Sequence, residues 1–132
     1  MLYAIRSIII NKPYFDVFDY ISRPENLPEW ANAFSSVADG KALLETPQGQ
    51  VPISLETLSE KEIGNVDWLM TFPDNSQGTA FSRVSPMPDN STLYSFTLTP
   101  PPVPLEELEG ALEQQVSILE SELKKLKSIL EK

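Results

Sequence analysis

The C-terminal segment, from about Pro104 to Glu131, has the pattern of one long amphipathic helix. Three glutamates near its start and three lysines near its end match the helix dipole. At 1.5 Å per residue such a helix is roughly 40 Å long, enough to cross a small sheet. Aliphatic residues recur along it at spacings of three and four, the period of one helix face: Leu105, Leu108, Leu112, Val116, Leu119, Leu123, Leu126 and Leu130. We expect this helix to pack on a sheet. A coiled-coil homodimer is the alternative, although Gly110 and Gln115 interrupt the heptad.

The N-terminus predicts a strand followed by a helix. The run Leu2–Ile10 is rich in β-branched residues and is followed by Pro13, which suits the first turn of a helix. Apolar and aromatic residues then recur at helical spacing from Tyr14 to Ile21. Strand and helix are therefore joined by a short connection.

A second short helix is predicted directly afterwards. Ser22, with Glu25 three positions later, resembles a capping box, and two prolines fit first-turn positions. We expect this helix to run through Trp30 to about Phe34.

From Ser36 to Thr99 the pattern changes to runs of alternating apolar and polar residues, best seen at positions 51–57 and 66–72. Turn residues separate these runs and predict an antiparallel meander with one apolar face: Asp39-Gly40, Gln48-Gly49, Ile63-Gly64-Asn65, Asp74-Asn75 and Pro88-Asp89-Asn90. The prolines at positions 100, 101, 102 and 104 form a stiff connector to the last helix.

Composition excludes several classes of function. The chain has no cysteine and no histidine, which excludes thiolate nucleophiles, disulfides, imidazole-bound zinc and the Ser-His-Asp triad. A net charge of −9 opposes nucleic-acid binding. No stretch is apolar for the ~18 residues of a membrane span and no signal-peptide cleavage site follows the first strand, so we expect a cytoplasmic protein. Asp16 and Asp19 are interpreted as a solvated face, and we expect no metal.

Three blocks of sequence are distinctive. Residues 8–30 read IIINKPYFDVFDYISRPENLPEW, residues 82–101 run from Ser-Arg-Val through a Pro-Asp-Asn turn to a Phe-Thr-Leu strand and prolines, and the last block is the helical Leu-Lys-Ser-Ile-Leu-Glu. These blocks and the order of elements resemble the START-like (SRPBCC) superfamily in its polyketide cyclase/dehydrase branch. The resemblance implies a single α+β domain over residues 1–132, with the helix-grip fold: a curved antiparallel sheet, two short helices and a long C-terminal helix. It implies a hydrophobic ligand in a cavity between sheet and helix, and no metal or nucleotide cofactor.

Candidate cavity residues follow from the strand faces. Trp68, Met70 and Phe72 share one face of a strand, and Tyr94 and Phe96 share one face of another. Trp30, at the end of the second helix, is expected to line the cavity mouth, or else to anchor the helix pair to the sheet, and Phe34 is a further cavity candidate. The alternative for the strand residues is an ordinary filled core.

Arg83 is an eighth candidate whose orientation the sequence leaves open. Arg83 shares a strand face with Phe81. If that face is inward, the guanidinium needs a carboxylate or ligand partner, because an unpaired buried guanidinium is costly. If Ser82 and Val84 face inward instead, Arg83 is solvated. Arg6 poses the same question, because its strand is apolar on both faces.

We expect binding or carriage of a hydrophobic small molecule, such as a lipid, polyketide or aromatic. A cyclase or dehydratase that stabilises an enolate with Arg83 or Arg6 and uses Tyr94 as acid or base is the alternative. A protein-interaction module that uses the acidic surface or the leucine-rich helix is the second alternative.

Overall fold

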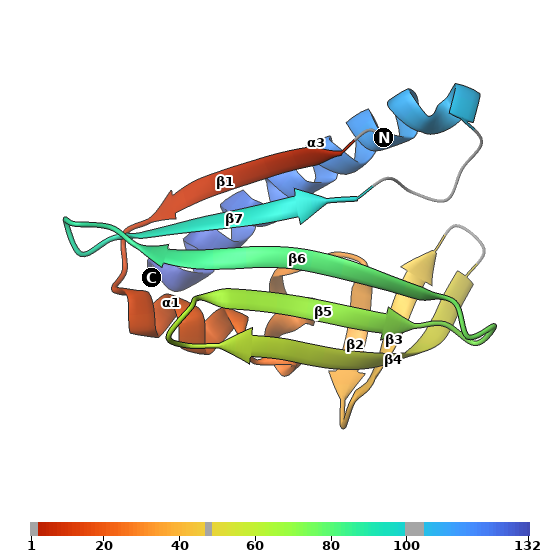
Figure 1. The fold of residues 1–132 in the computed structure, drawn as a ribbon, viewed down its shortest axis with the longest axis horizontal. Helices are drawn as coiled ribbons and strands as arrows, with labels where there is room; N and C mark the ends of the chain where they lie inside the picture. Colours follow the sequence, from red (N-terminus) through yellow and green to blue (C-terminus); the bar gives the residue numbers. More distant parts are fainter. Residues whose placement is uncertain (1–2, 47–48, 100–104) are drawn as a thin grey trace.

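The computed structural model describes residues 3–46, 49–99 and 105–132. Seven antiparallel strands form one curved sheet in the order β1-β7-β6-β5-β4-β3-β2, and the long C-terminal helix α3 passes diagonally behind β1 and β7 (Figure 1). Among the described residues, no helix combines the length and apolarity needed to cross a membrane. The elements are β1 (Ala4–Ile10), α1 (Tyr14–Ile21), the 3-10 helix η1 (Pro24–Asn26), α2 (Leu27–Trp30), β2 (Phe34–Ala38), β3 (Lys41–Thr46), β4 (Gly49–Glu60), β5 (Asn65–Thr71), β6 (Gln77–Pro86), β7 (Thr92–Leu98) and α3 (Leu105–Leu130). The predicted α+β helix-grip architecture is therefore confirmed.

The turns of the meander follow from residues that accept a left-handed backbone. Asp39 and Gly40 both have positive φ, of 53° and 74°, as a tight two-residue hairpin requires. Asn75 and Asn90 have φ of 69° and 65° in the turns that flank β6. Gly64 makes the closest approach, because its carbonyl accepts the Val84 N–H at 2.7 Å and a Cβ would lie 2.1 Å from the Val84 carbonyl oxygen. These turns fix the register of the strands.

The second short helix differs from the prediction. It ends at Trp30 instead of about Phe34, and Phe34 already pairs with Leu44 in the sheet. Ser22 is the C-cap of α1 and not the N-cap of the next helix, which follows Arg23. Ala31 leaves the helix in an extended conformation because strand pairing begins three residues later. Pro104, the predicted start of α3, lies outside the described residues.

One side of the sheet carries the hydrophobic core. From α1 come Val17, Phe18 and Ile21, and from α3 come Leu112, Leu119, Leu123 and Leu126, which are all buried. The buried leucines of α3 belong to the periodic row that predicted packing on a sheet. In the part of the chain that the structure describes, no helix lies over the opposite face of the sheet (Figure 1).

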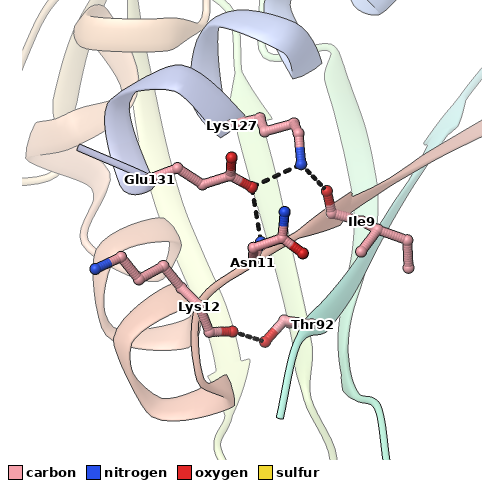
Figure 2. Close-up of polar contacts among 6 residues, drawn as sticks. All are labelled: Ile9, Asn11, Lys12, Thr92, Lys127 and Glu131. Carbon is pink, nitrogen blue, oxygen red and sulfur yellow. Dashed lines mark hydrogen bonds and ion pairs between the residues drawn. The ribbon is translucent and has the colours of Figure 1, made fainter. Parts of the chain in front are cut away.

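The C-terminal end of α3 is fastened to the edge strand β1 (Figure 2). The Lys127 amine donates to the Ile9 carbonyl and to the Glu131 carboxylate, each at 2.6 Å. The same carboxylate accepts the Asn11 N–H at 2.7 Å. Beneath it, the Thr92 hydroxyl donates to the Lys12 carbonyl at 2.7 Å. Burial and these polar contacts together fix the position of α3 on the sheet.

Replacing Lys127 with Met is expected to lower the midpoint of thermal unfolding by about 3–5 °C, because it removes two charge-assisted hydrogen bonds but keeps the aliphatic stem. Differential scanning calorimetry measures this shift. Lys124→Met, an exposed position on the same helix, is the matched control. Equal midpoints for the two variants would show that the Lys127 contacts do not hold the helix.

Candidate functional site

Seven of the eight candidate residues lie on the covered side of the sheet. Trp30, Trp68 and Tyr94 are buried, with 1%, 2% and 0% exposure. The other four pack against the same core and are partly buried: Phe34, Met70, Phe72 and Phe96. Trp30, Trp68, Tyr94 and Phe96, which we call the aromatic cluster, form its centre. Strand alternation placed Trp68, Met70 and Phe72 on one strand face and Tyr94 and Phe96 on another, and the structure brings both faces to the same side of the sheet.

The rings of the aromatic cluster contact one another across the sheet. Trp30 lies edge-on to Tyr94, with ring centroids 6.1 Å apart and an interplanar angle of 85°. The Trp30 and Trp68 centroids are 6.4 Å apart at 57°, and those of Trp68 and Phe96 are 6.4 Å apart at 27°. Trp30 therefore joins α2 to β5 and β7, which are separated in the sheet by β6.

Small residues of β6 make room for these contacts. Residues paired directly across antiparallel strands share a face, and the register places Ala80 beside Trp68 and Ser82 beside Phe96. Gly78 pairs with Met70; a Cβ at Gly78 would stand 3.8 Å from the Phe72 ring and 3.9 Å from the Met70 methyl group. At these positions the side chains of β6 are thus shorter than those of the neighbouring strands β5 and β7.

Buried polar atoms in this region lack partners. Trp30 Nε1, Trp68 Nε1 and the Tyr94 hydroxyl make no hydrogen bond with the part of the chain that the structure describes. The Thr57 hydroxyl is also buried without a partner, and Thr57 pairs directly with Trp68. An unsatisfied buried polar group costs about 1–3 kcal/mol, and native proteins contain few of them. Four such groups lie around one cluster, where an ordered water or a bound molecule would satisfy them.

Tyr94 is held as a neutral phenol. Burial raises the pKa of its hydroxyl, while the neighbouring Ser82 hydroxyl lowers this pKa in part. The charges of Asp67 and Glu122 raise the pKa further. Ser82 itself donates to the Val66 carbonyl, and its N–H donates to Asp67 Oδ1 at 3.2 Å. Although the Ser82 hydroxyl is near, it does not reach hydrogen-bond geometry with Tyr94.

Glu122 brings a carboxylate from α3 toward this region. It accepts the backbone N–H of Asn32, just after α2. Burial raises the pKa of Glu122, while the Asn32 N–H and the charge of Lys125 lower it in part. Sequence reasoning missed this residue, although the helical period places it between Leu119 and Leu126 on the packed face. Thr57 and Ser82 were missed as site residues because small polar side chains carry little signal in a strand.

Arg83, a candidate cavity residue, takes the outward of the two orientations that the sequence left open. Its side chain is exposed on the outer face of β6, because the buried residues of that strand are Ser82 and Val84. Arg6 lies at the margin of the sheet: its Nε is 3.8 Å from Glu120 of α3, and its guanidinium donates to the Ile5 carbonyl at 2.9 Å. Neither arginine joins the aromatic cluster.

An open groove of about 340 Å³ lies between β1 and α3, lined by Ala4, Arg6, Leu112, Glu113, Val116, Ser117 and Glu120. Within the described residues no three acidic side chains gather into a metal site. Asp16 is exposed, and Asp19 is exposed and paired with Lys61 at 3.7 Å. A second hollow, of about 190 Å³, is lined by Ser36, Ala38, Lys41, Ala42, Leu43, Pro52 and Ile53, and neither hollow includes a residue of the aromatic cluster. The aromatic cluster is taken as the candidate site because of its unpaired buried polar atoms.

Tyr94→Phe is expected to stabilise the ligand-free protein by ~1 kcal/mol, because it removes a buried hydroxyl that has no partner. Thr92→Val is the matched control: it also removes a fully buried hydroxyl, but one that donates to the Lys12 carbonyl, and it should cost ~1 kcal/mol. Urea denaturation measures both changes. A loss of stability in Tyr94→Phe equal to that in Thr92→Val would mean that Tyr94 has a partner within the chain.

Glu122→Gln is expected to raise the thermal midpoint near neutral pH and to have no effect in acid. Below the ordinary carboxyl pKa the group is protonated in both the folded and the unfolded chain. As the pH rises through the raised folded pKa, the buried charge lowers the stability of the wild type only. Calorimetry at several pH values tests this, with the exposed Glu113→Gln as control for net charge. A midpoint for Glu122→Gln below that of the wild type at neutral pH would contradict the expectation.

No family model matches the sequence, and no curated protein matches it. Solved structures do match over almost the whole chain. The protein XoxI from Bacillus cereus is 19% identical, with a TM-score of 0.70 over 98% of this chain and 96% of that one. A START superfamily protein from Mycobacterium smegmatis is 14% identical, with a TM-score of 0.69 over 98% and 97% of the two chains.

The Zhui aromatase/cyclase from Streptomyces sp. R1128 is also similar, with 9% identity and a TM-score of 0.69 over 98% of this chain and 93% of that one. Identities this low bear on the fold alone. The resemblance seen in the sequence is thereby confirmed at the level of the fold. The chain has the START-like (SRPBCC) helix-grip fold.

Proposed function

We propose that this chain binds a hydrophobic small molecule at the aromatic cluster, between the sheet and helices α2 and α3. The observation that carries the proposal is the set of four unpaired buried polar groups within an otherwise apolar region. Ligand sites are mostly apolar with a few convergent polar groups, and this is the composition of the cluster. The similarity to a START superfamily protein and to an aromatase/cyclase is consistent with such binding.

Binding is proposed in place of catalysis because of where the arginines lie. The cyclase hypothesis required Arg83 or Arg6 to stabilise an enolate, but Arg83 is on the outer face and Arg6 pairs with Glu120 at the sheet margin. The raised pKa of Tyr94 makes its hydroxyl a hydrogen-bond donor that does not ionise near neutral pH. Such a group recognises an oxygen atom without exchanging its proton.

The direct experiment is native mass spectrometry of protein purified from its own host, followed by organic extraction. Delipidated protein is then titrated with the neutral probe N-phenyl-1-naphthylamine, whose fluorescence rises in an apolar site. We expect a copurified mass or saturable binding of the probe. If no mass copurifies and the probe does not bind, the proposal is refuted.

A pair of adjacent substitutions locates the bound probe. Ala80→Leu adds volume to the inner face of β6 beside Trp68, whereas Thr79→Leu adds the same group on the outer face. We expect Ala80→Leu to weaken probe binding about tenfold and Thr79→Leu to leave it unchanged. Ala80→Val is the smaller alternative if Ala80→Leu fails to fold. Equal affinities for the inner and outer variants would place the probe elsewhere.

A further inference from the structure

We infer that the ligand is uncharged and carries a hydrogen-bond-accepting oxygen, such as the carbonyl of a ketone, quinone or ester, and that an anionic lipid such as a fatty acid is disfavoured. This inference rests on the proposed function and narrows it to a chemical class. Two independent observations carry it: the kind of polar groups left unpaired in the aromatic cluster, and the distribution of charge around it.

The unpaired groups have an excess of donors. A tryptophan Nε1–H donates and cannot accept, so Trp30 and Trp68 cannot satisfy each other. The hydroxyls of Tyr94 and Thr57 can both donate and accept. Because two hydroxyls cannot donate to each other at once, pairing among the four groups still leaves at least one donor hydrogen without an acceptor. A ligand with a carbonyl or similar oxygen accepts from such a donor, and in the free protein an ordered water takes that place.

The charges around the cluster oppose an anion. All ten Lys and Arg residues are described, and none of them is buried. Eight are exposed; of the other two, Lys127 binds the Ile9 carbonyl and Glu131, and Lys12 lies at the end of β1. The charges that act on the Tyr94 hydroxyl are the carboxylates of Asp67 and Glu122. A carboxylate or phosphate ligand would lose its hydration without meeting a cation.

Apolar side chains around the cluster match the apolar part of the proposed ligand. Met70 and Phe72 lie next to Gly78 of β6, and Phe96 stacks on Trp68. These side chains offer carbon and sulfur atoms and no charge. The site thus combines an apolar surface with donor groups at its centre.

Three naphthalenes of nearly equal size test the inference by isothermal titration calorimetry. 2-Acetylnaphthalene carries a neutral carbonyl, 2-naphthoate carries a carboxylate that is ionised at neutral pH, and 2-ethylnaphthalene carries no acceptor. We expect the ketone to bind about fivefold more tightly than the hydrocarbon and about tenfold more tightly than the carboxylate. Affinity of the carboxylate equal to or above that of the ketone would overturn the inference while leaving the proposed function intact.

Variants assign the preference to the cluster. Tyr94→Phe and Trp68→Phe each delete one donor and should reduce the preference for the ketone over the hydrocarbon. Thr97→Val, on the outer face of β7, should leave it unchanged. A preference that survives both donor deletions would also overturn the inference.

If none of the three naphthalenes binds, the chemical class of any copurified molecule decides whether the inference holds. A neutral carbonyl compound supports the inference, and a carboxylate or phosphate overturns it. Absence of both a copurified molecule and probe binding removes the proposed function, and the inference with it.

Discussion

The packing of Trp30 across the small residues of β6 is the contact on which the interior depends. It couples α2 to two strands that do not pair with each other, through the Trp68 ring of β5 and the Tyr94 ring of β7. In the strand between them, the small residue Ala80 pairs with Trp68 and the small residue Ser82 pairs with Phe96. The helix ends directly after Trp30 because the backbone of Ala31 is extended, although the Ala31 N–H still donates to the Leu27 carbonyl at 2.7 Å.

The same arrangement sets the polarity of the interior. Three of the four aromatic residues in the cluster are buried and carry a polar atom that apolar neighbours cannot satisfy. An interior composed of phenylalanine and leucine would be more stable on its own. The polar atoms have a destabilising cost in the free protein, which is the usual relation between a binding site and the fold that holds it.

Much of the architecture could be predicted from sequence because the signals were local. The turn pairs, the period of two in β5 and the period of three to four in α3 each reflect only the backbone and one buried face. Arg83 could not be oriented because β6 has small and polar residues on both faces, so Phe81 and Val84 each favoured a different interior. The end of α2 was misjudged because Phe34 leaves the helix to pair with Leu44, which is ten residues away. The unpaired state of Trp30 Nε1 depends on the positions of four elements, and no local pattern encodes it.

The contacts at the end of α3 also bear on how the chain behaves among other copies of itself. β1 is an edge strand with exposed Ile5 and Ile9, a combination that invites another strand to pair with it. Its outward carbonyls at these two positions already accept hydrogen bonds from Arg6 and Lys127, and the N–H of Asn11 is bound by Glu131. An incoming strand would have to displace three charged side chains before making its own ladder. These contacts therefore oppose edge-to-edge pairing at β1.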